Sequence, residues 1–172
     1  ITLQITEAGR TETICFSGDL GNYNRPLIRD MGQPKKADYV VIESTYGDRL
    51  HGERPDYITQ LTNIIQQTFE RGGNVVIPSF AVGRTQELLY LLRIIKENNL
   101  IKGFGDFPVY VDSPLAVEAT EIYSSDLTDY FDEETLDLLS KGINPIKFSN
   151  LNLSLTSEDS VRINLDKTPK VI

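Results

Sequence analysis

The chain has 172 residues and a net charge of −8, and 40% of its residues are hydrophobic and 24% charged. This size and composition are typical of one globular domain, or of one domain and part of another, and no apolar run approaches the roughly 18 residues of a membrane span. The acidic balance argues against nucleic-acid binding through a broad basic face, because phosphate binding usually draws on clustered lysine and arginine.

The first 16 residues are predicted to form a β-hairpin. Aliphatic and polar residues alternate over residues 1–6, which is the period of a half-exposed strand, and a turn at Gly9 leads to a second strand over 11–16. The single cysteine, Cys15, lies in that strand and cannot form an internal disulfide. Since no signal peptide is visible either, we expect a cytoplasmic location and no membrane partner.

Two acidic residues follow predicted strands in the next part of the chain. Asp19 stands between Gly18 and Gly21, in the manner of a tight loop that holds one side chain in a fixed direction. It is either an ordinary turn residue or a ligand. The β-branched run 40–42 predicts a buried strand of the parallel kind, and Glu43 follows it. In open α/β sheets ligands collect at this end of the strands, so Glu43 is a candidate functional residue.

From residue 56 onward, helical periods and short apolar strands alternate along the chain. Capping residues mark several helix starts, namely Asp56, Ser113 or its neighbour Asp112, and Asp132. The alternation indicates right-handed βαβ units, and therefore an α/β fold with a parallel sheet and helices on both faces. The predicted helices start at 56, 84 and 114 and cover 126–140 and 157–165; the strands cover 74–78, 108–111 and 170–172, and 141–156 is irregular.

Several common chemistries lack their residues here. The single histidine, His51, lies in a polar stretch, so it is either the base of a Ser-His-Asp triad or a solvated loop residue, and no G-x-S-x-G elbow accompanies it. No phosphate-binding loop or dinucleotide fingerprint is present, and cysteine and histidine clusters with zinc spacing are absent. The chain alone therefore has too few ligands for a catalytic metal.

Four motifs follow one another along the chain and gain meaning as a set. The motifs are FSGD at 16–19, VIESTYGDR at 41–49, PSFAVGRTQELL at 78–89, and VDSPLA at 111–116 with Ala119 and Thr120. Together they closely resemble the β-CASP branch of the metallo-β-lactamase superfamily, the RNA-processing nucleases of the cleavage-and-polyadenylation endonuclease type. The resemblance covers nearly the whole chain, in order and in spacing.

The resemblance implies a role for four residues. Asp19 matches the aspartate that bridges two zinc ions in the family, and Glu43 matches an acidic residue that orients a ligand histidine or proton carrier beside the metals. Two cations held roughly 3.5–4 Å apart need a shared anion and can activate water for attack on a phosphodiester. Arg84 and Ser113 are candidates for RNA binding. The alternatives are that Arg84 and Glu87 serve the packing of the domain and that Ser113 only caps a helix.

The resemblance also implies a domain division and a missing part. Residues 1–50 would be C-terminal strands of a metallo-β-lactamase αββα sandwich, and 51–172 most of a β-CASP domain. The metal-binding histidines of the family have no counterpart here, so we expect them before and after this chain in a longer parent protein. We further expect the piece to be inactive, to bind metal weakly and to form homodimers through residues 1–16.

The function expected for the parent is a zinc-dependent ribonuclease that acts in RNA processing. One alternative is a non-catalytic member of the family that binds RNA or serves as a scaffold. Another is a relative that acts on DNA or on a small ester.

Overall fold

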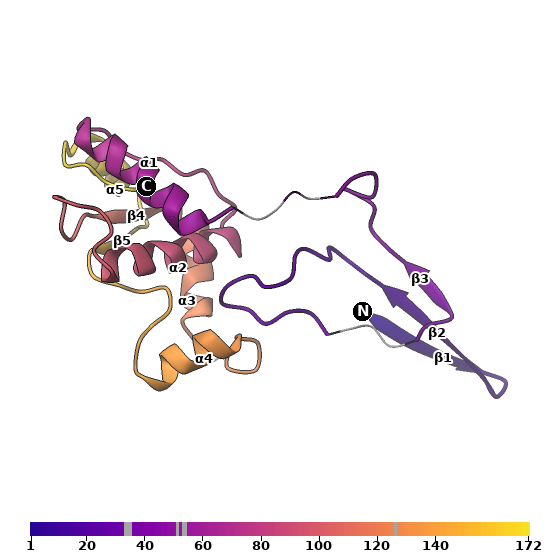
Figure 1. The fold of residues 1–172 in the computed structure, drawn as a ribbon. Coiled ribbons are helices and arrows are strands. Elements are labelled where there is room, and N and C mark those ends of the chain that lie inside the picture. Colours follow the sequence, from indigo (N-terminus) through magenta and orange to yellow (C-terminus); the bar gives the residue numbers. More distant parts are fainter. Residues whose placement is uncertain (33–35, 51, 53–54, 126) are drawn as a thin grey trace. The chain divides into compact units, whose positions relative to one another are not determined.

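The computed structural model describes residues 1–32, 36–50, 52, 55–125 and 127–172, and it divides the chain into two compact units (Figure 1). The N-terminal unit consists of Ile1–Arg25 and Asp30–Glu53, and the C-terminal unit of Pro26–Arg29 and Arg54–Ile172. Within the described ranges, no helix is both long and apolar enough to cross a membrane. His51 lies outside the described residues, and the assignment of residues 1–50 to a sandwich fold stays a prediction.

The N-terminal unit contains a three-stranded sheet. Strands β1 (Thr2–Glu7) and β2 (Arg10–Phe16) are antiparallel, which confirms the predicted hairpin. Its turn contains Ala8 and Gly9, both at positive φ, and glycine adopts that conformation without a steric cost. Strand β3 (Tyr39–Val41) pairs in parallel with the other edge of β2, so the sheet order is β1-β2-β3.

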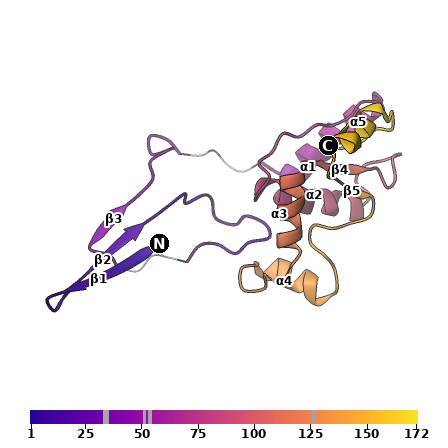
Figure 2. The ribbon, with the colours of Figure 1, turned by 180° about the vertical axis from the view of Figure 1, so that it is seen from behind.

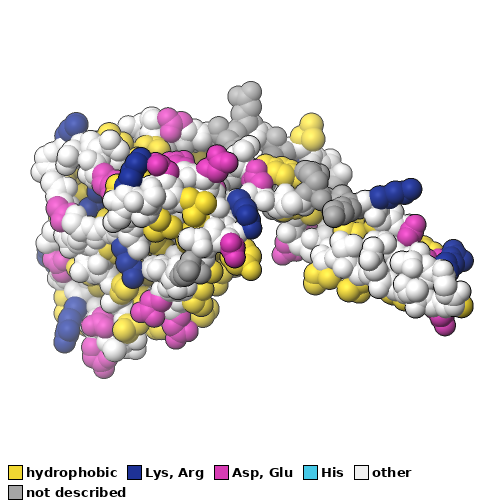
Figure 3. Space-filling view, turned by 90° about the horizontal axis from the view of Figure 1, so that it is seen from below, with side chains coloured by type: hydrophobic (Ala, Val, Ile, Leu, Met, Phe, Trp, Pro, Cys, Tyr) yellow, Lys and Arg dark blue, Asp and Glu magenta, His cyan; other side chains and the backbone are white. Residues whose placement is uncertain are grey.

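The prediction that β3 is buried is wrong. Val40 and the neighbouring Ile42 are 62% and 64% exposed. The physical reason is that the N-terminal unit has no helix among its described residues, so neither face of its sheet is covered by a second layer. Hydrophobic side chains accordingly reach the surface in the space-filling view of Figure 3.

The C-terminal unit is built on parallel strand pairing. Strands β4 (Val109–Asp112) and β5 (Leu151–Ser154) are parallel, and Val171 forms parallel bridges with both Val75 and Val109. The four segments therefore lie side by side in the order 75, 171, 109, 151. The parallel α/β prediction is confirmed, but β5 falls in a stretch predicted to be irregular, and the expected strand at 74–78 is reduced to its bridge.

Among the residues that the structure describes, five helices complete the C-terminal unit, and most begin at a capping side chain. Asp56, Ser113, Asp132 and Thr156 each accept a hydrogen bond from an amide in the first turn of the helix that follows. The last predicted helix but one is shorter than expected, since it starts only after Asp132. The helices are α1 (Tyr57–Glu70), α2 (Arg84–Glu97), α3 (Pro114–Tyr123), α4 (Glu133–Ser140) and α5 (Ser157–Leu165).

Helices cover both faces of this parallel sheet. Val109 and Val111 lie in one hydrophobic core with Leu89 and Leu92 of α2. Tyr110 lies between these two valines in β4 and lines a second cavity together with residues of α5. Figures 1 and 2 show β4 and β5 between α2 and α5. This layered arrangement brings the carboxyl ends of the strands to one edge, where two of the sequence motifs begin.

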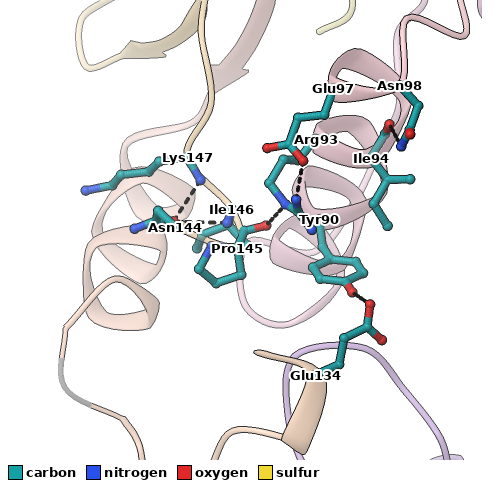
Figure 4. A network of polar contacts seen from close by, with 10 residues as sticks. All are labelled: Tyr90, Arg93, Ile94, Glu97, Asn98, Glu134, Asn144, Pro145, Ile146 and Lys147. Carbon is teal, nitrogen blue, oxygen red and sulfur yellow. Dashed lines mark hydrogen bonds and ion pairs between the residues drawn. The ribbon is translucent and has the colours of Figure 1, made fainter. Parts of the chain in front are cut away.

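Polar contacts tie α2 to the chain that surrounds it (Figure 4). The hydroxyl of Tyr90 donates a hydrogen bond to Glu134 of α4, and Arg93 Nε donates to the carbonyl of Pro145 at 3.0 Å. Burial, and next the hydrogen bond to Glu134, raise the pKa of the Tyr90 phenol. The guanidinium of Arg93 lies over the Tyr90 ring at 5.1 Å from its centre and pairs with Glu97. These contacts therefore anchor α2 near its centre.

Candidate functional site

Strands β2 and β3 end at the same edge of the N-terminal sheet, because they run in parallel with Phe16 opposite Val41. The pairing extends one residue further, since the Ser17 amide donates to the Val41 carbonyl at 2.9 Å. The two chains then continue into loops that carry Asp19 and Glu43. The prediction that both residues follow strand ends is therefore confirmed by the backbone, although β3 is exposed.

Glu43 connects these two loops through its backbone and its carboxylate. Its amide donates to Ser17 Oγ at 3.0 Å, and its Oε1 accepts a hydrogen bond from the Leu20 amide at 2.8 Å. The other carboxylate oxygen accepts from Thr45 Oγ1 at 3.1 Å. Leu20 is the residue after Asp19, so the carboxylate of Glu43 holds the loop on which Asp19 is presented.

Asp19 itself is solvent-exposed in a loop with glycines at positive φ on either side. Gly18 has φ +58° and Gly21 has φ +65°, and a side chain at either position would be strained. Among the described residues, no hydrogen bond or ion pair to the Asp19 carboxylate is found. The loop thus fixes the backbone around an acidic side chain that remains available to a ligand.

The described residues do not form a metal centre by themselves. They contain no group of three or more histidine, cysteine, aspartate or glutamate side chains placed to hold a metal ion. One exposed carboxylate fits as a single donor, but a binuclear zinc site needs several donors on each ion. The complete donor set for the two zinc ions expected from the resemblance is therefore not present in the part of the chain that the structure describes.

The third motif forms a tightly bonded loop before α2. Thr85 Oγ1 donates to the Phe80 carbonyl at 2.8 Å, and the Thr85 amide reaches the same carbonyl at 3.3 Å. Gln86 Nε2 donates to the Ala81 carbonyl at 3.1 Å, and Gln86 Oε1 accepts from the Gly83 amide at 2.7 Å. The first side chains of the helix therefore turn back to hold the preceding loop, residues 79–83.

This bonding bears on the expectation that Arg84, at the start of α2, contacts RNA. The amides of Arg84 and Glu87 donate to the carbonyls of Val82 and Gly83, at 3.1 and 3.0 Å, so they are already engaged. The side chain of Arg84 forms an ion pair with Glu87 at 3.2 Å and is 51% exposed. The geometry favours the packing alternative for the amides, while RNA binding by the Arg84 side chain stays a prediction.

Ser113 and Asp112 of the fourth motif both make contacts within the domain. Ser113 Oγ accepts a hydrogen bond from the Ala116 amide at 3.3 Å, and Pro114 occupies the first position of α3. Asp112 accepts a hydrogen bond from Ser160 Oγ at 2.5 Å, which joins the end of β4 to α5. The capping alternative for Ser113 is thus realised, and its proposed contact with RNA stays a prediction.

A cavity of about 380 Å³ brings the third and fourth motifs together. Its polar wall contains Ser79, Thr85, Asp112 and Ser113, and its apolar wall comes from α2 and the ends of the parallel segments. The hydroxyls of Ser79 and Thr85 lie 2.8 Å apart. This is the edge at which ligands collect in open α/β sheets, and the volume lies within the range of small-ligand sites.

Sequence reasoning missed the part played by Thr85 and Gln86. Gln86 is fully buried and also donates to Thr120 Oγ1 at 3.0 Å, so it joins α2 to α3 as well as to the loop. The available signal was a Thr-Gln pair in the first turn of an amphipathic helix. A polar side chain on the buried face of a helix needs a partner, and the unsatisfied ends of the loop supply it.

The fold and these loops define the class of protein first: an α/β protein with polar motifs gathered at the carboxyl ends of parallel strands. Comparison with known families then makes this specific, because residues 85–172, more than half of the chain, match the model of the Beta-Casp domain. The chain belongs to the β-CASP family, as its motifs predicted.

Individual relatives are consistent with that membership. A ribonuclease of Thermus thermophilus is 34% identical over 168 residues, which are 98% of this chain and 38% of that protein. An RNase J-like protein of Methanocaldococcus jannaschii is 34% identical over 77% of the chain and 31% of its own length. The cleavage and polyadenylation specificity factor 73 of Drosophila melanogaster is 34% identical over 65% of the chain and 16% of its own length. The chain thus spans well under half of these relatives.

Proposed function

We propose that the protein containing this chain is a metal-dependent ribonuclease that hydrolyses RNA phosphodiester bonds in RNA processing. The observation that carries the proposal is the Glu43 carboxylate, which holds the Leu20 amide at 2.8 Å and so presents Asp19 from the neighbouring strand end. Family membership and a ribonuclease relative along 98% of the chain support the same chemistry.

In this proposal the residues of the chain have separate tasks. Two zinc ions, held mostly by residues outside the described set, would supply the positive charge and activated water that phosphodiester hydrolysis needs. Asp19 contributes one carboxylate toward them. Glu43 orients the loop of Asp19 and supports the proton carrier of the reaction. The C-terminal unit supplies one wall of the RNA-binding surface, with Arg84 as a cationic contact.

The experiment is cleavage of labelled single-stranded RNA by the whole protein, with and without a chelator. We expect Glu43→Gln to lower kcat/KM by about 10- to 100-fold, which is typical when a carboxylate beside a metal site is lost. Asp19→Asn should abolish the chelator-sensitive activity. Glu7→Gln is the matched control, because it changes an exposed carboxylate of the same unit, in β1 and outside the four motifs, and should stay within about two-fold.

Different outcomes of this experiment separate the alternatives. Metal-dependent cleavage of DNA with no cleavage of RNA would show that the substrate is DNA. RNA binding without cleavage would show that the protein is a non-catalytic scaffold. Zinc, manganese and magnesium are then added separately to the chelated protein, and the ion that restores cleavage identifies the metal. Equal activity of the wild type, Asp19→Asn and Glu43→Gln would contradict the proposed site.

Self-association and location belong to the same proposal. β1 is an edge strand with exposed Leu3 and Ile5, 47% and 52% exposed, so it can pair with a second copy. Sedimentation of the chain should show dimers that are lost when both residues are replaced by lysine. A monomer at every concentration would contradict this pairing. The cytoplasmic location is tested by fractionation.

A further inference from the structure

Phe80 differs from the buried phenylalanines of the C-terminal unit. It is 85% exposed, whereas Phe69, Phe107 and Phe131 are at most 3% exposed. A phenylalanine left in water forgoes the stabilisation that burial would give it. The internal packing of the described domain therefore gives no reason for an aromatic ring at this position.

The backbone beneath Phe80 is held firmly although its ring is free. The Phe80 carbonyl accepts hydrogen bonds from both the amide and the hydroxyl of Thr85, and Gln86 holds the next carbonyl, that of Ala81. Both polar residues are buried. A ring on such a loop loses little conformational freedom when it binds a partner, because its backbone is already ordered.

The surroundings of this ring indicate what the partner is. Ser79 and Thr85, whose hydroxyls are hydrogen-bonded to each other, line the cavity at the strand ends. Arg84 lies four residues further on, with a side chain 51% exposed and an ion pair at 3.2 Å. Glu87, its partner in that pair, is only 14% exposed, but a guanidinium has five N–H donors, so Arg84 can keep the pair and still donate to a phosphate. An exposed ring followed by an available cation matches the base and phosphate of a single strand.

We propose that Phe80 is a substrate-positioning residue that stacks on one base of single-stranded RNA, with Arg84 contacting an adjoining phosphate. This inference rests on the proposed function and adds to it a residue of the C-terminal unit that touches the substrate. Stacking on an aromatic face is tolerant of sequence, because every base has such a face. Phe80 should accordingly contribute to affinity for RNA of any sequence.

The absence of tryptophan from the chain makes a direct test possible. Phe80→Trp introduces a single tryptophan at an exposed position, where the core is not disturbed, and a stacked base quenches its fluorescence. The matched control is Tyr130→Trp, at an exposed aromatic residue of the same unit, 61% exposed. Titration with an oligouridylate of about 12 nucleotides should quench the first variant in a saturable manner and leave the second unchanged. An abasic oligomer of equal charge should quench neither.

Affinity provides the second measurement, by fluorescence anisotropy of end-labelled RNA. Phe80→Ala should weaken binding by about 5- to 150-fold, Phe80→Leu by a similar factor, and Phe80→Tyr little, because only the last keeps an aromatic face. Equal affinity of wild type and Phe80→Leu with no quenching would overturn the stacking contact, as would failure of the chain to bind RNA. The proposed function is judged separately, by chelator-sensitive cleavage in the whole protein.

Discussion

Removal of the Gln86 side-chain amide should strongly destabilise the C-terminal unit, because this one amide makes three hydrogen bonds. Gln86 is fully buried, and its amide serves the Gly83 amide, the Ala81 carbonyl and Thr120 Oγ1 at 2.7, 3.1 and 3.0 Å. Gln86→Leu keeps a side chain of similar size but can form none of these bonds. The loss therefore falls on partners that remain in place, which is the costly way to break a hydrogen bond.

The magnitude follows from what each partner can do instead. Thr120 keeps its hydrogen bond to the Ala116 carbonyl at 2.7 Å, so its hydroxyl is not left unsatisfied. The Gly83 amide and the Ala81 carbonyl lose their partners, and each costs about 1–3 kcal/mol if no water reaches it. Since both residues are partly buried, we expect a total of about 2–4 kcal/mol for Gln86→Leu.

Urea unfolding followed by circular dichroism at a helix band measures this loss. All described helices lie in the C-terminal unit, so the helix signal reports that unit. With a slope of about 2 kcal/mol per molar urea, the midpoint should fall by about 1–2 M. Gln67→Leu, the same change at an exposed position of α1, should leave it within about 0.3 M. A double-mutant cycle with Thr120→Val should give a coupling of about 0.5 kcal/mol or more. A loss no larger than that of the control would refute the reasoning.

Three further predictions concern the remaining polar contacts. Folding raises the pKa of Tyr90, so the stabilisation from its phenol is present below the unfolded pKa of about 10 and is lost at higher pH. Between about pH 9.5 and 11.5 the free energy of unfolding should therefore fall less steeply in Tyr90→Phe than in the wild type. The hydrogen bond from Lys96 lowers the pKa of Asp106, so the stabilisation from this carboxylate is present above about pH 4 and is lost on acidification. Between about pH 5 and 2.5 the urea midpoint should therefore fall less in Asp106→Asn than in the wild type. Ser113→Ala should cost about 1 kcal/mol in urea unfolding, because the cap of α3 is lost, and Ser113→Asn should restore the loss.

Local features of the fold were predictable from the sequence, because a few neighbouring residues determine them. Asp56 and Asp132 cap helices whose starts follow from the residue types at the first turn. The hairpin likewise depends on alternation and on one turn. Strand β5 was missed because its Leu-Asn-Leu-Ser sequence contains no β-branched residue, and its pairing with β4, some 40 residues earlier, is a tertiary effect.

The candidate site shows the same division. The motif identified Glu43 as a functional candidate, but its hydrogen bond to the Leu20 amide joins positions 23 residues apart and could not be derived from either motif alone. Exposure of β3 was equally unpredictable, since a β-branched run indicates a strand suited to burial and does not reveal what covers it. The candidate residues could thus be named from the sequence, whereas the contacts that hold them could not.

Motif residues in this chain are of two sorts, and the difference decides how each should be tested. The side chains of Thr85, Gln86 and Ser113 are used within the domain, so the fold itself explains their identity. The carboxylate of Asp19 and the ring of Phe80 are presented on firmly held loops and are exposed to solvent. Substitution of the first group should therefore change the free energy of unfolding, and substitution of the second should change catalysis or RNA affinity at constant stability. If Phe80→Ala instead lowered the unfolding midpoint as Gln86→Leu does, the ring would have a structural partner and the division would be wrong.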